Sequence, residues 1–419
     1  MTERRQDPTV MPVDTARYRR PIKHFTVATL SRTWVANRDA TRDPGVAGVD
    51  GVSARQFSQN LENDLRRLSQ SLVGGTFQFK HLRPFFPPKK SGGYRVICVP
   101  TISDRLVQRV IVESLTANDR FRLLNEASYG FIRGRSVRGA ISKAISERTN
   151  CEWVLKTDIH SYFDRIDREE LADKIKKRLG PHSLVPILLQ AIKCEVETRS
   201  EKDRQRLSAS GIKRGRGLRQ GMPISPLLSN LVLGDFDRTV LKAGFRLVRY
   251  ADDLIVFGAD KSEVEAAYEL IVSELSKLGH TVPEPGEHSK TQFVLPQKPV
   301  EFLGVDIVFK GQTNSYVCRI PKKVKEQILA DVADDYTYKN VIKRFKDLGA
   351  LTRSLSGMPA AYRNAYRHAD DWPAFEPQLR RECSLAFLRV YEAIFGKPVV
   401  SGLDDMARNF LGIRDIPFD

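Results

Sequence analysis

Two adjacent aspartates, Asp252 and Asp253, constrain the fold of this chain more than any other feature. They separate two largely apolar runs, residues 245–248 and 254–257. Such runs on either side of a short acidic segment predict a β-hairpin with both carboxylates at its tip. Two carboxylates so close together repel each other unless a cation lies between them. The hairpin therefore indicates a metal site, although this stretch alone leaves a solvated acidic turn as an alternative.

The charge balance points to a polyanionic partner. The 419 residues carry a formal net charge of +17, with 28% charged and 41% hydrophobic residues. The hydrophobic share is typical of a globular protein that can bury a core, whereas such an excess of cations is typical of proteins that bind nucleic acid. A basic protein that is merely soluble is the alternative.

The cysteines and the apolar runs predict a compartment. The five cysteines are far apart in the sequence and form no Cys-x-x-Cys pair, so we expect neither a disulfide framework nor a zinc site. The charged N-terminus has no signal-like apolar region, and no apolar run reaches the length of a membrane span. We therefore expect a cytoplasmic protein without a membrane partner.

The hydrophobic pattern predicts an α+β protein whose C-terminal part is helical. Residues 24–72 have helical spacing, with Ser53 as a helix cap, and the chain beyond Pro321 is expected to be wholly helical. Other expected elements are a hairpin over 85–100, a helix capped by Ser103, a buried strand over 153–158, helices from 227 to about 237 and over 264–278, strands over 289–293 and 301–305, and helices over 322–335, 341–355 and 375–395.

Three further segments carry cations or carboxylates. In the 85–100 hairpin, Lys89, Lys90 and Arg95 flank a Ser-Gly-Gly turn, an arrangement that suits a triphosphate; a basic surface hairpin is the alternative. Residues 199–219, with eight basic and two acidic residues, predict an irregular loop that grips a nucleic-acid backbone or is simply solvated. Asp158, at the end of the buried strand, is a natural third metal ligand.

Residues 128–136 combine aromatic residues, glycines and arginines within nine positions. Aromatic rings and guanidinium planes stack on bases, and arginine also binds phosphate, so the segment is a candidate nucleic-acid contact. A plain turn in the core is the competing interpretation.

Taken in order, five segments resemble the motifs of reverse transcriptases, specifically bacterial ones of the group II intron type. They are residues 89–100, 128–136, 158–164, 220–230 and 250–253, with weaker matches at Lys290-Thr291 and 302–304. Tyr-Ala-Asp-Asp is a weak signal by itself, but its position after Asp-x-x-x-x-Phe-Asp and Gln-Gly-x-Pro-x-Ser-Pro makes a strong one. The resemblance covers roughly residues 30–310 and implies a right-hand polymerase fold of fingers, palm and thumb, with an antiparallel palm sheet.

The resemblance also implies a division of the chain. We expect a basic N-terminal arm over 1–22, a helical N-terminal extension over 23–80, fingers over 81–150, a palm over 151–310 with a basic segment near 180–219, and a helical thumb and C-terminal region over 311–419.

The chemistry implied is the attack of a 3′-hydroxyl on the α-phosphate of a dNTP. Two Mg²⁺ ions, about 3.5–4 Å apart, stabilise the attacking and leaving oxygens, and Mn²⁺ is a substitute. By resemblance, Asp158, Asp252 and Asp253 hold the metals with the carbonyl of Ile159. Further implied roles are triphosphate binding by Arg95 with Lys89 or Lys90, nucleotide lining by Gln220 and Gly221, exclusion of a 2′-hydroxyl by Phe163, and protonation of pyrophosphate by Lys290.

Departures from related groups narrow the expected subtype. No Cys or His cluster of an endonuclease follows Phe302, and the Asn-Ala-x-x-His element of retron enzymes occurs only out of place, at 364–368. Ser225-Pro226 differs from the Ser-Gln of diversity-generating enzymes. By elimination we expect an RNA-directed DNA polymerase of bacterial antiphage defence, which copies a structured noncoding RNA into DNA.

Three alternatives stay open at this point. The chain could be an intron-derived or retron-like reverse transcriptase of a mobile element, or a non-catalytic nucleic-acid-binding scaffold. It could also be an RNA polymerase on the same palm, which Phe163 argues against. Whether the chain binds a second copy of itself or a partner protein also stays open.

Overall fold

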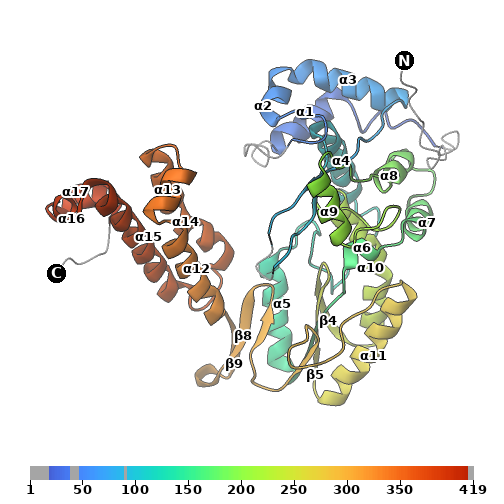
Figure 1. Ribbon diagram of the computed structural model, residues 1–419. Coiled ribbons are helices and arrows are strands. Elements are labelled where there is room, and N and C mark those ends of the chain that lie inside the picture. Colours follow the sequence, from blue (N-terminus) through green and yellow to red (C-terminus); the bar gives the residue numbers. More distant parts are fainter. Residues whose placement is uncertain (1–17, 38–46, 89–91, 414–419) are drawn as a thin grey trace. The chain divides into compact units, whose positions relative to one another are not determined.

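The computed structural model describes residues 18–37, 47–88 and 92–413 (Figure 1). The chain forms two compact units. The first comprises Met1–Ser136, Thr157–Val256 and Ser262–Gln292, and the second comprises Val137–Lys156, Phe257–Lys261 and Phe293–Asp419. The chain thus passes between the units several times. The predicted division into fingers, palm and thumb stays a prediction.

The first unit begins with the predicted helices α1 (Val27–Ala36), α2 (Ala54–Gln59) and α3 (Leu61–Gly74). Ser53 caps α2, as the sequence predicts, and also forms a capping box with Gln56. The ring of Phe57 packs 5.0 Å from that of Trp34 and joins α2 to α1.

The 85–100 hairpin forms with short strands. They are β1 (Arg83–Phe85) and β2 (Ile97–Val99), which pair antiparallel. The following helix, α4 (Ile102–Thr116), is capped by Thr101, whose hydroxyl accepts a hydrogen bond from the backbone N–H of Asp104. The prediction that Ser103 caps this helix is therefore wrong: Ser103 already lies in the first turn.

A four-stranded sheet has the order β4-β5-β3-β6. Its strands are β3 (Trp153–Asp158), β4 (Arg246–Tyr250), β5 (Asp253–Gly258) and β6 (Gln292–Val294). The predicted acidic hairpin is β4 and β5 with a tight turn between them. Helices of this part of the chain are α6 (Tyr162–Arg165), α7 (Arg168–Leu179), α8 (Val185–Ala191), α10 (Ser225–Lys242) and α11 (Lys261–Lys277).

The expected loop over 199–219 is half helical. Residues Glu201–Ala209 form α9, which Ser200 caps by accepting a hydrogen bond from the N–H of Asp203. No side chain of α9 is buried, so the helix has no apolar face that could reveal it in the sequence. Only residues 210–219 form the turn-rich segment that was predicted for the whole stretch.

The second unit combines a small antiparallel sheet with helices. The sheet is β7 (Val300–Phe302), β8 (Val305–Lys310) and β9 (Ser315–Arg319), and α5 (Val137–Asn150) packs on β9. The strand predicted over 301–305 in fact contains the β7–β8 turn, where Leu303 and Gly304 have φ of 52° and 81°. The helices are α12 (Lys322–Asp335), α13 (Tyr338–Arg344), α14 (Leu348–Tyr366), α15 (Trp372–Phe395), α16 (Lys397–Ser401) and α17 (Asp405–Phe410).

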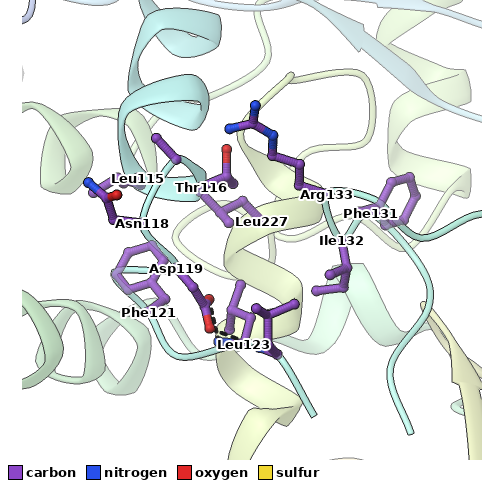
Figure 2. Close-up of a pocket in the computed structure, with 12 residues that line it drawn as sticks. Leu115, Thr116, Asn118, Asp119, Phe121, Leu123, Phe131, Ile132, Arg133 and Leu227 are labelled. Carbon is purple, nitrogen blue, oxygen red and sulfur yellow. Dashed lines mark hydrogen bonds between the residues drawn. The ribbon is translucent and has the colours of Figure 1, made fainter. Parts of the chain in front are cut away.

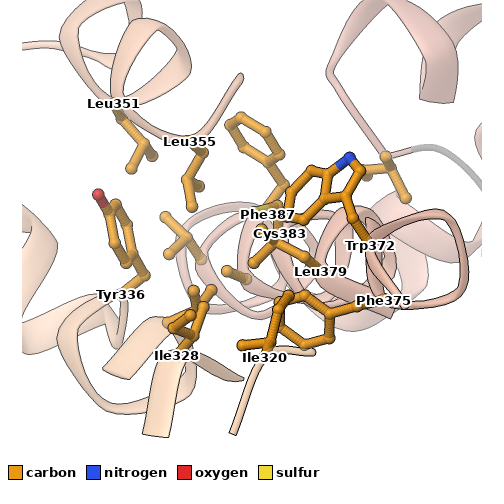
Figure 3. Close-up of a cluster of buried hydrophobic side chains, with 14 of the residues drawn as sticks. Ile320, Ile328, Tyr336, Leu351, Leu355, Trp372, Phe375, Leu379, Cys383 and Phe387 are labelled. Carbon is orange, nitrogen blue, oxygen red and sulfur yellow. The ribbon is translucent and has the colours of Figure 1, made fainter. Parts of the chain in front are cut away.

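The single helix predicted over 341–355 is two helices, α13 and α14. They separate at Asp347, which caps α14 through the N–H of Ala350. Figure 3 shows the buried hydrophobic cluster of this unit, where Trp372, Leu379 and Phe387 of α15 lie among buried side chains of α12 and α14. The predicted α+β class with a helical C-terminal part is confirmed.

The cysteines and the membrane-span prediction can be compared with the structure. All five cysteines are buried free thiols. Within residues 18–37, 47–88 and 92–413, no helix has both the length and the apolar character needed to cross a bilayer.

Candidate active site

The acidic turn lies between β4 and β5, where Ala251 adopts a left-handed backbone with φ of 57°. The backbone carbonyl of Asp252 accepts a hydrogen bond of 3.1 Å from the N–H of Ile159. This contact brings the turn beside Asp158, the last residue of the neighbouring strand β3. Burial, followed by the nearby Asp158 carboxylate, raises the pKa of Asp252. Two of the three predicted carboxylates therefore lie within electrostatic reach of each other.

These carboxylates fit a divalent cation only in part. Among the residues that the structure describes, no group of three or more Asp, Glu, His or Cys side chains is close enough to hold a metal ion. Asp158 and Asp252 repel each other, which is the condition that a cation between them would relieve. Mg²⁺ is often held by one or two carboxylates with water and phosphate oxygens, so this pair is compatible with it. Asp253 lines the same cavity as Asp252.

Lys290 also belongs to this acidic region. Its ammonium donates a hydrogen bond to Oδ2 of Asp158, although 72% of the lysine side chain is exposed against 13% for the aspartate. The hydroxyls of Thr291 and Thr157 share a buried hydrogen bond of 2.7 Å, which fixes Lys290 opposite the end of β3. A predicted site residue more than 130 positions from Asp158 thus contacts it.

An open cavity of about 1070 Å³ collects most of the other predicted site residues. Its volume lies just above the usual range for ligand pockets, about 300–1,000 Å³. Predicted residues that line it are Arg95, Phe163, Gln220, Gly221, Asp252 and Asp253. Lys89 and Lys90 lie outside the described residues. The cavity combines cations, carboxylates, an aromatic ring and an amide, a set that suits a charged ligand with a flat ring.

Gly221 allows one wall of this cavity to form. Its φ of 104° disfavours any residue with a side chain, and a Cβ there would lie 2.6 Å from the carbonyl oxygen of Cys98. The preceding carbonyl, that of Gln220, accepts a hydrogen bond of 2.7 Å from the N–H of Cys98. The loop therefore packs backbone against backbone on β2, which sets Gln220 at the cavity.

Helix α9 holds the hairpin side of the cavity. The guanidinium of Arg206 stacks 4.3 Å from the ring centre of Tyr94 and donates a 3.2 Å hydrogen bond to its hydroxyl. Tyr94 precedes Arg95, whose N–H donates to the carbonyl of Pro87 at 2.9 Å. Sequence reasoning missed Arg206 because it treated α9 as an irregular loop.

Phe163 lies on α6 and is backed by two buried rings. Its ring packs edge-on 5.4 Å from that of Tyr162, which in turn packs 5.0 Å from the ring of His280. His280 is 1% exposed, and neither ring nitrogen has a hydrogen-bond partner among the described residues. Burial, followed by the cations of Arg165 and Arg216, lowers the pKa of His280 from 6.5 to about 4.

Because His280 is buried without a hydrogen-bond partner among the described residues, we expect the folded chain to lose stability in acid. The unfolded chain protonates His280 below a pH of about 6.5, whereas the folded chain does so only near 4, so stability is lost as the pH falls between these values. Between about pH 7.5 and 5 the loss from His280 is about 2 kcal/mol. We expect His280→Phe to remove this part of the pH dependence in urea unfolding. His288→Phe, at an exposed histidine, is the control, and equal slopes for both variants would contradict the assignment.

The 128–136 segment packs against the acidic hairpin. The N–H of Tyr129 donates to the carbonyl of Arg249 at 2.8 Å, and a Cβ on Gly130 would lie 2.5 Å from the N of Ala251. The guanidinium of Arg135 donates to the carbonyl of Ser128 and stacks on Tyr129 at 4.8 Å. The core-turn interpretation therefore accounts for Tyr129 and Arg135.

Phe131 is the exposed aromatic residue of this segment, and its ring lies 6.0 Å from that of Tyr250. It lines the large cavity and also a smaller, mainly apolar one of about 440 Å³. Figure 2 shows the smaller cavity, with Leu115, Phe121, Leu123 and Leu227 among its lining side chains and Phe131 and Arg133 beside them.

Comparison with known proteins adds sequence evidence. A family model described as reverse transcriptase (RNA-dependent DNA polymerase) matches residues 87–307. Protein YkfC of Escherichia coli K12 is 32% identical over 199 residues, 46% of this chain and 49% of that protein. Group II intron-encoded protein LtrA of Lactococcus lactis subsp. cremoris is 24% identical, with 62% of this chain and 40% of that protein covered.

A retron protein and a solved structure are also similar. Retron Mx65 reverse transcriptase of Myxococcus xanthus is 27% identical, with 48% of this chain and 46% of that protein covered. The chain spans about half or less of the length of these three curated relatives. Among solved structures, truncated apo telomerase from Candida Tropicalis has a TM-score of 0.41 at 17% identity, with 59% of each chain covered.

Proposed function

Because the chain belongs to the reverse transcriptase (RNA-dependent DNA polymerase) family, we propose that it synthesises DNA from dNTPs on an RNA template. The observation that carries this proposal is the single cavity onto which Arg95, Phe163, Gln220 and the Asp252-Asp253 pair converge. An incoming nucleotide needs a cation for its phosphates, a surface for its sugar and carboxylates near its α-phosphate. The cavity offers all three kinds of group.

We assign the chain's own residues as follows. Asp158 and Asp252, with Asp253 and the Ile159 carbonyl in support, would hold two Mg²⁺ ions or Mn²⁺ in their place. The bound ions would supply charge stabilisation for the attacking and leaving oxygens. Arg95 binds the triphosphate, with Lys89 or Lys90. Gln220 and Gly221 line the incoming nucleotide. Lys290 would give a proton to the leaving pyrophosphate.

The direct test is primer extension by the purified chain. A DNA primer on an RNA template, with dNTPs and Mg²⁺, is expected to be extended to the end of the template. Extension with rNTPs in place of dNTPs would favour the RNA polymerase alternative. Binding of the hybrid without extension in Mg²⁺ or Mn²⁺ would favour the scaffold alternative.

Phe163 is expected to select the sugar. In the mutant Phe163→Ala, space opens beside the 2′-carbon, so we expect discrimination against rNTPs to fall by at least about tenfold, a change of about 1.4 kcal/mol. The measurement is the ratio of kcat/KM for dCTP to that for CTP in primer extension. The dCTP value of the same variant reports any general damage from the lost ring. An unchanged ratio would refute the sugar gate.

Exposed cations next to the cavity are proposed to contact the nucleic-acid backbone. Lys213, Arg214 and Arg216 are exposed in the turn-rich segment after α9, as the predicted backbone grip requires. Arg219 differs: it is buried, and its Nη2 donates to the carboxylate of Glu195 at 2.7 Å. This arginine anchors the segment, and the three exposed cations are proposed to contact phosphates through their charge.

For the biological setting we propose antiphage defence in the cytoplasm, with a structured noncoding RNA as template. The sequence lacks the retron element at its usual place, which is the support for a separate defence enzyme. The similarity to LtrA and to a retron reverse transcriptase supports the mobile-element alternative. Sequencing of the RNA and DNA that copurify with the chain, together with phage challenge of cells carrying the gene and its flanking DNA, separates the two. Intron RNA, with no protection against any phage, would overturn the defence role.

A further inference from the structure

A buried arginine lies directly beneath the acidic turn. Arg249, in β4, is 1% exposed, and all five of its N–H groups have acceptors. Nε and Nη2 donate to the two carboxylate oxygens of Asp237, each at 2.6 Å. Nη2 also donates to the Ser128 hydroxyl at 2.9 Å, and Nη1 donates to Oδ1 of Asn230 at 3.0 Å and to the carbonyl of Ala251 at 2.8 Å.

These acceptors come from three parts of the first unit. Asn230 and Asp237 belong to α10, Ser128 to the segment that packs on the hairpin, and Ala251 to the turn itself. The Asn230 amide also donates to the carbonyl of Gly130 at 2.7 Å. The guanidinium therefore joins the turn to α10 and to the 128–136 segment.

The contact with Ala251 has a conformational consequence. Ala251 precedes Asp252 and has a left-handed backbone, which is unfavourable for a residue with a Cβ. A hydrogen bond to its carbonyl from a fully paired, buried guanidinium holds that conformation. If Ala251 relaxed to an ordinary backbone, the direction of the chain at Asp252 would change, and with it the direction of the carboxylate.

We propose that Arg249 is a positioning residue, which fixes the left-handed turn so that the Asp252 carboxylate faces that of Asp158. The inference deepens the proposed function and rests on it for its kinetic readout. A buried ion pair such as Arg249–Asp237 contributes little net stability, because desolvation offsets the attraction. Arginine supplies a planar guanidinium whose five N–H donors have a fixed arrangement, and lysine lacks this geometry.

The test is Arg249→Lys, which keeps the positive charge opposite Asp237 but cannot reach all five acceptors. We expect kcat for dNTP incorporation to fall at least about 100-fold, with the dNTP KM changed less than about threefold. Mn²⁺ binding, followed by electron paramagnetic resonance without any substrate, should weaken at least about tenfold.

Arg148→Lys is the matched control. Arg148 is also 1% exposed and donates to the backbone carbonyls of Glu152, Leu295 and Lys298, all within the second unit. The Arg148→Lys variant should lower the Tm as Arg249→Lys does. It should nevertheless keep kcat and Mn²⁺ affinity within about threefold of the parent. Equal kinetic effects for the two lysine variants would overturn the positioning role.

A second substitution separates positioning from stability. Glycine adopts a left-handed backbone without strain, so the Ala251→Gly background should need the arginine less. We expect the kcat loss caused by Arg249→Lys to be at least about threefold smaller in that background. An equal loss in both backgrounds would overturn the proposal.

Two further outcomes have different meanings, namely a variant that does not fold and a parent chain that does not polymerise. If Arg249→Lys fails to fold, Ser128→Ala removes one acceptor of the guanidinium, and it is expected to lower kcat about threefold to tenfold; unchanged kcat and Mn²⁺ affinity would refute the inference. If the parent chain does not polymerise, the proposed function fails, while the Mn²⁺ comparison of Arg249→Lys with Arg148→Lys still decides the positioning role.

Discussion

Replacing both turn carboxylates, Asp252→Ala with Asp253→Ala, is expected to abolish primer extension, with a loss of at least about 1000-fold in kcat. Both side chains line the large cavity, and Asp252 lies within electrostatic reach of Asp158. Their removal leaves no anionic pair at the tip of the hairpin to hold a cation. Binding of an RNA–DNA hybrid should change little, because it rests on the net charge of +17 and its exposed cations.

The matched control is Glu169→Ala with Glu170→Ala. These two adjacent, exposed acids lie in the first turn of α7 and do not line the cavity, and their loss changes the net charge by the same amount. Extension kinetics and hybrid affinity should be measured for both double variants. Extension by the aspartate variant at more than about 1% of the parent rate would place the reaction at other residues.

Gly221→Ala should cause the second largest loss. The new Cβ would lie 2.6 Å from the carbonyl oxygen of Cys98 and 2.9 Å from Cγ2 of Ile97, so the loop or β2 must shift. Such overpacking typically costs about 1–3 kcal/mol, in addition to the penalty for the positive φ. Because the shift moves Gln220 relative to the hairpin that carries Arg95, we expect kcat/KM for dNTPs to fall at least about 50-fold.

Gly244→Ala separates the two causes. Gly244 has a φ of 91°, similar to that of Gly221, but a Cβ there would meet nothing within 4 Å. The Gly244→Ala variant should therefore show only the backbone penalty, about 1–2 kcal/mol in the free energy of unfolding, with normal kinetics. The measurements are urea unfolding and steady-state extension. If Gly221→Ala resembles Gly244→Ala in both, close packing on β2 does not shape the cavity.

The acidic hairpin could be predicted because it depends on residues that are close together in the sequence. Apolar runs on both sides of Asp252-Asp253 define two strands and a tip, and a carboxylate at the end of another apolar run predicts Asp158. That Asp158 lies beside the tip depends on strand order, which the family resemblance implied and spacing alone did not. The same holds for the convergence of Arg95, Phe163 and Gln220 on one cavity.

Other features of the fold could not be predicted from hydrophobic patterns because polar contacts determine them. Helix α9 buries no side chain, so it has no apolar period, and its start depends on the hydroxyl of Ser200. The break between α13 and α14 depends on the cap at Asp347. For the 128–136 segment the sequence left a nucleic-acid contact and a core turn open, and Gly130 and Tyr129 serve the close approach to the acidic turn. A glycine between two aromatic residues is the signal that could have indicated such packing.

The interleaving of the two units limits how this chain could exchange parts with a relative by recombination. The helical second unit takes α5 from early in the chain, and Ile141 of α5 belongs to the same buried cluster as Leu355 and Phe387. A gene fusion with one junction near residue 293 would therefore join the C-terminal segment of one parent to the α5 of another. Such chimeras should inherit a mismatched core, so functional hybrids would require two exchanged segments rather than one.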